Sequence, residues 1–538
     1  MGRPWLATYP ENVPAEINPT MYSSLLEPID AAVGRFAERI AFVCGDETLT
    51  FAHFAERSKA LARFLMQECA LDVGNRVAVM LPNNLAFPVT LTGVLRAGGV
   101  QVNINPLYTA RELRHQLVDS GSTILIVDAS VIPVVEAAIE GTEVVKVIFV
   151  GNADIADFQK KHTLACISFD EAIEIGKSAN ELPERLLSRT DLALLQYTGG
   201  TTGVSKGAEL THGNLTSNLL QTLAFLRTTV RDQEETIVTA IPLYHIFALT
   251  VNLLTFLVVG GKNVLVTNPR DTAQLDAAFR NNHVTVFTGV NTLFNGLLSI
   301  PSLKSLDLST IKLALGGGSA VQRVVSDKWY SRTGRHIVEG YGLSETSPVL
   351  TMNLPTGLQF SGAVGIPVPS TEVSIRDSNG MQVKNGEVGE IYVRGPQVMR
   401  GYWRRLAETA DVMTPDGFFR TGDGGFLDDR GYLTIADRIK DMVIVSGFNV
   451  YPNEVEAVIS QIPDVFESAV VGIPDEVTGE AVKAFVVSRS ANVTEEKVIE
   501  VCRANLAAYK VPKHIEFILE IPKSTVGKLL RRELRNRG

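Results

Sequence analysis

Residues 197–208 read Tyr-Thr-Gly-Gly-Thr-Thr-Gly-Val-Ser-Lys-Gly-Ala. Three glycines within five residues let a polyanion approach the backbone N–H groups, because no Cβ blocks the way. The interleaved threonines add hydroxyl donors, and Lys206 adds a positive charge. The stretch follows the apolar run Leu192–Leu195 and precedes a helix expected from about His212. This placement predicts a phosphate-binding loop.

The loop is not a Walker A motif. That motif has Gly directly before its Lys and Ser or Thr directly after it, whereas Ser205 and Gly207 flank Lys206 here. The mismatch excludes the kinases and motors that use a P-loop. For a Gly- and Thr-rich stretch considered alone, a flexible surface turn is the alternative.

The residues before the loop alternate between helix and strand patterns. Thr109 and Glu112 form a capping-box pattern that predicts the start of a helix. Such alternation favours parallel sheets covered by helices. Residues 151–190 are polar and weakly patterned, which predicts a surface connection. The expected buried strands are the apolar runs Arg76–Leu81, Thr123–Val127 and Val144–Val150.

The pattern changes after about residue 360, where short strand-like runs alternate with turn signals. This predicts antiparallel β-structure. The last hundred residues return to mixed α/β, with strands at Ala469–Gly472 and Val482–Val487 and a helix near Thr494. The turn signals are Asp377–Gly380, Lys384–Gly386, Pro415–Gly417 and Asp429–Gly431.

Composition limits the partners. The 538 residues hold 50 Lys and Arg against 59 Asp and Glu, a net charge of −9. This argues against a nucleic-acid partner, which needs concentrated positive charge. The cysteines form no CxxC pair and no zinc-like cluster with His, so a reduced, cytosolic setting without a structural metal is expected. They are Cys44, Cys69, Cys166 and Cys502.

No stretch has the pattern of a membrane span. The most apolar one, Leu249–Gly261, carries Asn252 and is too short to cross a bilayer. It is interpreted as a buried helix or strand. Contact with a membrane surface is left open.

The loop at Tyr197–Ala208 resembles the nucleotide-binding signature of the adenylate-forming superfamily, which contains acyl-CoA synthetases, peptide-synthetase adenylation domains and luciferases. Six further motifs of the superfamily follow in the same order along nearly the whole chain. A single motif could match by chance, but the ordered set could not. The other motifs are Pro242–Leu249, Gly316–Ala320, Glu339–Thr346, Arg420–Asp423, Asp437–Asp441 and Pro522–Lys528.

Within the superfamily, the sequence is most similar to the bacterial long-chain-fatty-acid–CoA ligases. Their characteristic strings appear at Pro242–Thr250, Thr267–Asp271, Gly289–Asn295, Ser446–Glu454 and Tyr509–Lys513. The resemblance implies an α/β fold in which stacked α/β sheets and a β-rich subdomain form a large N-terminal domain. A small mobile α+β domain follows. The expected domains are residues 1–438 and 439–538.

The resemblance also implies a reaction in two halves. A fatty acid carboxylate attacks the α-phosphorus of ATP, giving acyl-AMP and pyrophosphate, and coenzyme A then displaces AMP. Thr198, His245, Glu345 and Lys528 are the implied catalytic residues. Glu345 and Thr198 are the implied Mg²⁺ ligands, since a cation that bridges phosphates favours oxygen donors. The implied phosphate-binding residues are Thr198, Gly199, Gly200, Thr201, Thr202, Gly203, Lys206 and Thr346.

The nucleoside would be held by other motifs. Tyr341 would stack on adenine and Asp423 would accept the ribose hydroxyls, with Arg438 adding a second contact. Without their motifs, Tyr341 would be interpreted as an aromatic residue of the core, and Asp423 and Arg438 as a surface ion pair. The remaining implied nucleotide-binding residues are Gly316, Gly317, Gly318, Ser319, Glu339 and Gly342.

The last implied roles concern the acyl group and coenzyme A. Lys528 would act in adenylation, although a basic solvated tail is its alternative. Lys440 falls at the family's hinge, and Gly447 belongs to a segment that would line the pantetheine tunnel. His245 would lie at the carboxylate end of the acyl pocket or, equally, in an ordinary core.

Three functions stay open on the sequence. The favoured one is a cytoplasmic fatty acyl-CoA ligase acting on long chains, with medium-chain and aryl acids as alternatives. The second is an acyl-AMP ligase that loads a carrier protein, and the third is a nonenzymatic protein on the same fold. A homodimer and peripheral contact with the inner membrane face are also left open.

Overall fold

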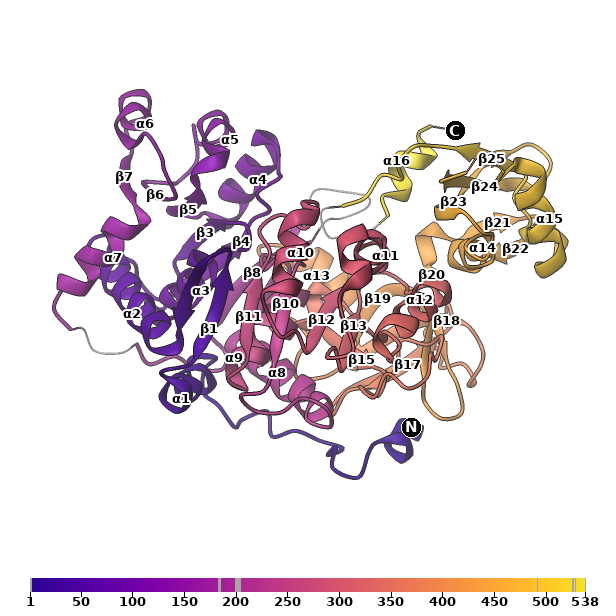
Figure 1. Cartoon of the computed structure of the whole chain (residues 1–538), viewed down its shortest axis with the longest axis horizontal. Helices are drawn as coiled ribbons and strands as arrows, with labels where there is room; N and C mark the ends of the chain where they lie inside the picture. Colours follow the sequence, from indigo (N-terminus) through magenta and orange to yellow (C-terminus); the bar gives the residue numbers. More distant parts are fainter. Residues whose placement is uncertain are drawn as a thin grey trace.

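The computed structural model describes residues 2–181, 185–198, 205–490, 492–524, 527 and 529–537. These residues include four β-sheets with helices packed around them. Figure 1 shows the last part of the chain, strands β21–β25 with α14 and α15, as a small unit at the upper right of the larger body. The α/β class expected from the sequence is confirmed.

The first sheet has the strand order β7-β6-β5-β3-β4-β8-β9, and all its pairs except β8–β9 are parallel. In β3, Val77 and Val79 enter one hydrophobic core while Ala78 and Met80 enter another. A strand buried on both faces needs a continuous apolar run, which is the pattern predicted here. The strands are β3 (Arg76–Met80), β4 (Val100–Asn103), β5 (Ile124–Asp128), β6 (Lys146–Val150), β7 (Ala165–Ser168), β8 (Leu192–Thr198) and β9 (Lys206–Thr211).

The second sheet has the order β16-β15-β14-β13-β12-β10-β11-β1-β2. Strands β12, β13 and β14 run parallel, so their carboxyl ends meet at one edge, where ligands commonly bind in α/β proteins. The strands are β1 (Ile40–Cys44), β2 (Glu47–Thr50), β10 (Thr236–Thr239), β11 (Lys262–Leu265), β12 (Val286–Gly289), β13 (Leu313–Gly316), β14 (Val338–Gly342), β15 (Val349–Met352) and β16 (Ile366–Pro367).

Helix α8 (His212–Leu226) is buried on nearly every side, including its polar residues. Asn218 donates to the Val349 carbonyl and Gln221 to the Pro369 carbonyl, which satisfies amides that would be costly to bury alone. The other helices of the large body are α1 (Leu26–Phe36), α2 (Phe51–Gln67), α3 (Ala86–Arg96), α4 (Ala110–Ser120), α5 (Ile132–Ala138), α6 (Ile155–Lys161), α7 (Phe169–Ser178), α9 (Thr255–Val258), α10 (Thr272–Arg280), α11 (Asn291–Ser299), α12 (Arg323–Thr333) and α13 (Leu406–Val412).

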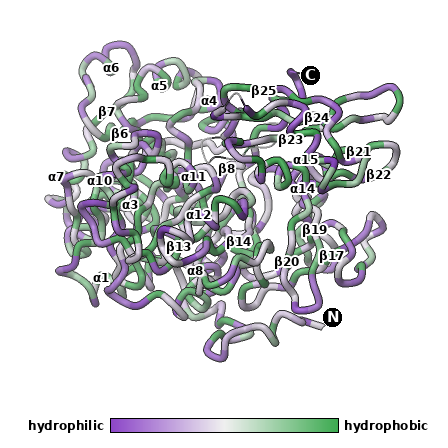
Figure 2. Tube along the Cα trace, turned by 45° about the vertical axis from the view of Figure 1, so that its right-hand side comes forward, coloured by the Kyte–Doolittle hydropathy of each residue, from purple (hydrophilic) through white to green (hydrophobic). Residues whose placement is uncertain are grey.

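The apolar stretch Leu249–Gly261 was expected to be a buried helix or strand, and it is helical up to Val258. It comprises most of a π-helix (Ala248–Leu254) and all of α9. Asn252 is satisfied inside the core, where its side chain donates to the hydroxyls of Thr239 and Thr288. Hydrophobic and hydrophilic segments alternate along the whole tube in Figure 2. Over the described ranges, no helix combines the length and apolarity that crossing a membrane requires.

The prediction for residues 151–190 was wrong, because this region contains α6, β7 and α7. Asp154 and Ser168 cap the two helices by accepting hydrogen bonds from backbone N–H groups. Helix α7 buries Phe169 and Ile173, and it packs on α2. The apolar stripe of α7 is narrow and lies among charged residues. The segment is therefore polar on average, and its sequence did not indicate a helix.

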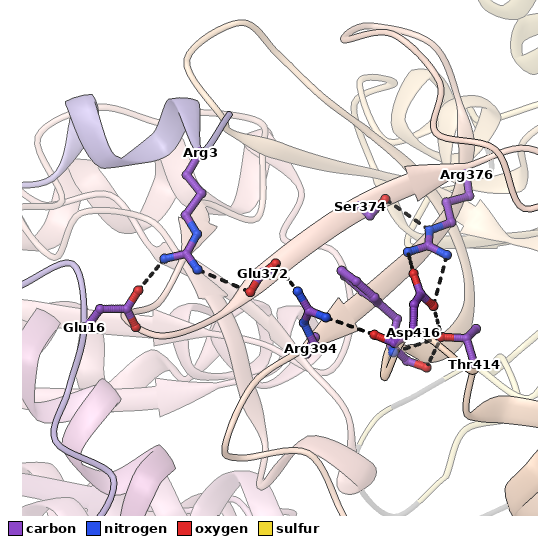
Figure 3. A network of polar contacts seen from close by, with 9 residues as sticks. Arg3, Glu16, Glu372, Ser374, Arg376, Arg394, Thr414 and Asp416 are labelled. Carbon is purple, nitrogen blue, oxygen red and sulfur yellow. Dashed lines mark hydrogen bonds and ion pairs between the residues drawn. The ribbon is translucent and has the colours of Figure 1, made fainter. Parts of the chain in front are cut away.

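The sheet β17-β18-β19-β20 is antiparallel, as predicted. Figure 3 shows that the N-terminal arm is tied to it, since Arg3 pairs with both Glu16 and Glu372. Glu372 also pairs with Arg394 at 2.8 Å, and Arg376 pairs with Asp416 at 2.7 Å. The strands are β17 (Glu372–Arg376), β18 (Gly389–Arg394), β19 (Phe419–Leu427) and β20 (Leu433–Arg438).

The C-terminal sheet has the order β22-β21-β24-β23, and β25 pairs with β24. The two strands expected here are parts of β23 and β24, and Thr494 caps α15 as predicted. The elements are β21 (Val443–Val445), β22 (Phe448–Val450), α14 (Pro452–Ile459), β23 (Val465–Asp475), β24 (Gly479–Ser488), α15 (Glu495–Asn505), β25 (His514–Phe517) and α16 (Arg531–Arg535).

Candidate active site

The predicted phosphate loop joins two antiparallel strands, β8 and β9. Thr198 ends β8 and lies opposite Lys206, the first residue of β9. The sequence predicted the strand before the loop and the helix at His212, but it did not predict β9. Gly199, Gly200, Thr201, Thr202 and Gly203 lie outside the described residues.

The base of this hairpin is braced by residues that no motif identified. Trp403 donates its backbone N–H to the Gly207 carbonyl at 2.8 Å and its indole N–H to the Asp119 carbonyl at 3.0 Å. The Tyr197 hydroxyl donates to Asp119 Oδ2 at 2.7 Å. Burial, together with this carboxylate, raises the pKa of Tyr197. The hairpin is therefore fixed to helix α4 and to the 402–405 segment.

Glu345 lies next to this hairpin in a short 3₁₀ turn (Ser344–Thr346). Its Oε1 accepts a 2.8 Å hydrogen bond from the Tyr402 hydroxyl, and Lys206 Nζ lies 5.1 Å from the centre of the Tyr402 ring. Burial and the charge of Glu345 raise the pKa of Tyr402, which therefore stays a hydrogen-bond donor. Glu345 and Lys206 thus approach the same aromatic ring from different elements.

The surroundings of Glu345 fit a magnesium ion that is held mainly by substrate and water. Within the described part of the chain, no three His, Cys, Asp or Glu side chains cluster in a way that could hold a metal. Magnesium is commonly bound by one or two carboxylates together with phosphate oxygens and waters. A single buried carboxylate beside a phosphate-loop hairpin suits that mode.

Thr346 is fully buried beside Glu345. Its hydroxyl lies 2.6 Å from the Pro348 carbonyl, to which it can donate, and it accepts from the Leu343 N–H at 3.0 Å. A threonine hydroxyl has only one proton to donate. Donation to an α-phosphate would therefore require the bond to Pro348 to break.

The glycines expected at adenine begin with the last residue of β13, at the edge where β12, β13 and β14 end. A Cβ added to Gly316 would lie 2.6 Å from Val321 Cγ2, and Gly318 has a φ of +77° that favours glycine. A Cβ at Gly317 would lie 3.3 Å from the Phe247 ring. The half-buried Ser319 follows in the same loop. Gly316 and Gly317 therefore lie where a side chain would not fit without movement of its neighbours.

Glu339 holds the chain just after this loop by a hydrogen bond. It lies on β14, is 6 % exposed, and accepts a 2.7 Å hydrogen bond from the Val321 N–H. Burial raises the pKa of Glu339 to about 8. The carboxyl is therefore largely protonated at neutral pH.

Tyr341 and Asp423 meet although they belong to different sheets. The Tyr341 hydroxyl donates to Asp423 Oδ2 at 2.6 Å, and Arg438 Nε lies 3.5 Å from Asp423 Oδ1. Burial, and then the charge of Asp423, raises the pKa of Tyr341 well above its ordinary value. The structure thus joins three of the residues predicted to hold the nucleoside, and Gly342 follows Tyr341 at the end of β14.

His245 lies between β10 and the π-helix and is half-buried. Its Nδ1 accepts from the Phe247 N–H at 3.3 Å, and its carbonyl accepts from the Leu249 N–H. The adjacent Tyr244 carbonyl accepts from the Gln196 side chain of β8 at 3.1 Å. The segment is thereby connected to the strand that leads into the phosphate loop.

The remaining predicted residues lie toward the carboxyl terminus. Lys440 belongs to the 3₁₀ turn Ile439–Asp441, where burial, with a smaller effect of the Arg438 charge, lowers its pKa. Gly447 lies between β21 and β22 with a φ of +83°. Lys528 lies outside the described residues. Its neighbour Gly527 contacts Val290, since an added Cβ would be 2.7 Å from Val290 Cγ2.

Three residues of this region were not identified from the sequence: Asp119, Tyr402 and Trp403. Asp119 lies 78 positions from Tyr197, and no local spacing connects them. The aromatic pair at 402–403 also lacks a pattern. Only tryptophan's low count, 3 in the whole chain, could have drawn attention to Trp403.

Comparisons with known proteins identify the family. Residues 29–403 match the family model described as AMP-binding enzyme, and residues 454–528 match that of the AMP-binding enzyme C-terminal domain. The chain is similar to a long-chain-fatty-acid–CoA ligase from Yersinia pestis, with 47 % identity over 100 % of this chain and 98 % of that protein.

Two solved structures share the fold. ATP-bound MatB from Rhodopseudomonas palustris has a TM-score of 0.82 at 30 % identity, covering 96 % of this chain and 99 % of that one. The anthranilate CoA ligase AuaEII in complex with anthranoyl-AMP has a TM-score of 0.89 at 24 % identity, covering 97 % and 99 %. Because these family models cover most of its length and the similar ligase matches all of it, the chain belongs to the AMP-binding enzyme family.

Proposed function

We propose that the protein is an ATP-dependent acyl-CoA ligase acting on long-chain fatty acids. The observation that carries this proposal is the 47 % identity, over the whole chain, to a long-chain-fatty-acid–CoA ligase. The cluster of Tyr341, Asp423 and Arg438 supports it, because a carboxylate held by two donors is ordered to receive ribose hydroxyls.

The first half-reaction joins two anions, so positioning and charge stabilisation should dominate its catalysis. A carboxylate oxygen bonds to the α-phosphorus of ATP as the bond to pyrophosphate breaks. Lys206, Thr198 and the loop between them hold the leaving phosphates. Asp423 and Arg438 fix the ribose, the Gly316–Gly318 loop accepts adenine beside Tyr341, and His245 faces the acyl carboxylate.

Glu345, with Thr198, would hold Mg²⁺ in this reaction. When bound, the ion neutralises charge on the phosphates. Tyr402 orients Glu345 for this role through its 2.8 Å hydrogen bond. Removing magnesium with a chelator should therefore abolish pyrophosphate release.

In the second half-reaction, the coenzyme A thiolate attacks the acyl carbon and the bond to AMP breaks. Residues 439–538 form the small domain that serves both halves, with Lys440 at its hinge and Gly447 beside the pantetheine path. Lys528 acts in the first half only. Lys528→Ala should abolish acyl-AMP formation and spare thioester formation from supplied acyl-AMP, and equal loss of both would refute that role.

Pyrophosphate release with palmitate, measured with and without coenzyme A, tests the function. Palmitoyl-CoA formation that depends on ATP and coenzyme A supports the proposal. Accumulation of acyl-AMP without thioester would indicate a ligase that loads a carrier protein. A panel from short to long fatty acids plus aryl acids would then define the substrate class, and a preference for medium-chain or aryl acids would correct it.

We also propose that the protein works in the cytoplasm, with reversible contact at the inner membrane face. The support for membrane contact is that three apolar side chains are exposed to solvent. Leu186 is 99 %, Leu406 88 % and Leu519 99 % exposed. Co-sedimentation with phospholipid vesicles tests the contact. Light scattering tests whether the protein is a homodimer, which would have twice the 58.4 kDa mass of one chain.

A further inference from the structure

Arg531, the first residue of α16, is enclosed by carboxylates. Its Nη2 lies 2.8 Å from Glu456 Oε1, and its Nη1 lies 3.9 Å from Asp437 Oδ1. The side chains of Arg531, Glu456 and Asp437 are only 11 %, 9 % and 2 % exposed. Arg531 also donates to the Asn453 side chain at 3.0 Å. Buried charges persist only when paired in this way.

Asp437 and its partners come from different parts of the molecule. Asp437 lies on β20, in the antiparallel sheet of the large body, whereas Asn453, Glu456 and Arg531 belong to the C-terminal unit. Asp437 Oδ2 also accepts a 2.9 Å hydrogen bond from the Asn453 N–H. Asp437 therefore ties the C-terminal unit to β20 through two separate residues.

The neighbour of Asp437 in β20 is Arg438, which faces the nucleoside cluster. Arg438 lies opposite Asp423 in the sheet, and Asp437 lies opposite Gly424. Two consecutive residues of one strand thus serve two sites. Arg438 contacts the carboxylate proposed to bind ribose, and Asp437 holds the C-terminal unit.

Arg531 also follows the segment that contacts the large body near the adenine loop. Lys523 and Leu529 form an antiparallel bridge, and Lys523 pairs with Glu467 at 2.6 Å. Gly527, within this segment, contacts Val290, and an added Cβ would lie 3.2 Å from Thr292 Oγ1. The bridge and Arg531 together fix the position of Gly527 beside Val290.

We propose that Asp437 and Arg531 are positioning residues for acyl-adenylate formation, because together with the Lys523–Leu529 bridge they hold Gly527 against Val290 and Thr292. The inference rests on the proposed function, in which Lys528 of this segment serves the first half-reaction. Neither residue belongs to the proposed substrate contacts. The second half-reaction does not use Lys528, so it does not need the pair.

The test separates the two halves of the reaction. Asp437→Asn removes the charge facing Arg531 but keeps an oxygen for the Asn453 N–H and leaves the Arg531–Glu456 pair intact. Since a misplacement of about 1 Å can cost about 100-fold in rate, palmitate-dependent ATP–pyrophosphate exchange should fall by about that factor in kcat. Transfer from synthetic palmitoyl-AMP to coenzyme A should stay within about threefold of wild type.

Arg531→Lys is the second variant, because a lysine keeps the charge near Glu456 but cannot bond to two carboxylates in the same geometry. The same loss confined to exchange is expected. Arg532→Lys is the matched control on the same helix. Arg532 is exposed, so exchange should stay within about threefold of wild type.

Equal loss of both half-reactions in Asp437→Asn, with a lower unfolding temperature, would show a merely structural pair and overturn the proposal. Unchanged exchange in Asp437→Asn and Arg531→Lys would also overturn it. If wild type fails on palmitate but exchanges with another acid, the proposed substrate is wrong and the pair is judged on that acid. If no acid supports exchange in wild type, both proposals fall together.

Discussion

The hydroxyl of Tyr341 donates a 2.6 Å hydrogen bond to Oδ2 of Asp423, although the two residues lie 82 positions apart. Tyr341 is the last but one residue of β14 in the nine-stranded sheet, and Asp423 belongs to the antiparallel sheet of β17–β20. The bond joins the two sheets at the proposed nucleoside site. Asp423 therefore depends on both sheets for its orientation.

Tyr341→Phe should weaken ATP use while leaving the fold intact. A hydrogen bond to a charged group is worth about 1.5–3 kcal/mol, so kcat/KM for ATP should fall about 10- to 100-fold. Steady-state kinetics with ATP varied would measure it. Tyr330→Phe is the control, because Tyr330 is 45 % exposed and stacks on His336 instead. Equal effects in both variants would contradict the role of Tyr341.

Glu339 makes a prediction about pH and stability. Burial raises its pKa to about 8 in the folded protein, above the ordinary value of 4.5. Between these values the folded state holds a proton that the unfolded state has lost, so the free energy of unfolding falls as pH rises from about 5 to 8. Each tenfold difference in proton affinity is worth about 1.4 kcal/mol, which predicts a total loss of about 3 kcal/mol or more.

Glu339→Gln should remove this dependence, because glutamine stays neutral and can still accept from the Val321 N–H. Urea denaturation of both proteins at pH 5, 7 and 9 measures it. The variant should gain on wild type as pH rises, with the largest gain at pH 9. Parallel pH profiles for the two proteins would show that Glu339 titrates normally.

Local signals in the sequence predicted much of the fold. The capping box at Thr109 and Glu112 is present at the start of α4, and Gly380 closes the turn that begins at Asp377. Such features depend only on near neighbours in the chain. Helix α7 was missed because its burial depends on α2, more than a hundred residues earlier.

In the site, too, local motifs were predicted from the sequence and tertiary contacts were not. Ordered motifs identified Tyr341, Asp423 and Arg438, which the structure brings together. The contact of Tyr402 with Glu345 spans 57 positions and follows no spacing rule. The bonds that orient a functional side chain are set by tertiary packing, so the sequence could predict the roles but not their supports.

Tyr402→Phe should weaken magnesium use. Residues that orient a metal ligand typically contribute 10- to 100-fold in metal affinity, so half-maximal pyrophosphate release should need about tenfold more Mg²⁺. Titration of activity with Mg²⁺ at saturating ATP measures it. Glu345→Gln should lose activity that added Mg²⁺ does not restore. If the Mg²⁺ concentration at half-maximal activity is unchanged in Tyr402→Phe, Tyr402 does not contribute to magnesium binding.

Gly176→Ala should destabilise the contact between α7 and α2. A Cβ at Gly176 would lie 1.9 Å from the Ala60 carbonyl oxygen, so the two helices must move apart. Overpacking of this kind costs about 1–3 kcal/mol, and the midpoint of urea unfolding should fall. Gly34→Ala is the matched control, because Gly34 also lies in a helix, α1, and an added Cβ would meet nothing within 4 Å. Alanine is the better helix former by about 1 kcal/mol, so Gly34→Ala should raise the midpoint. A raised midpoint in both variants would mean that helix propensity, and not the approach to Ala60, decides the outcome at Gly176.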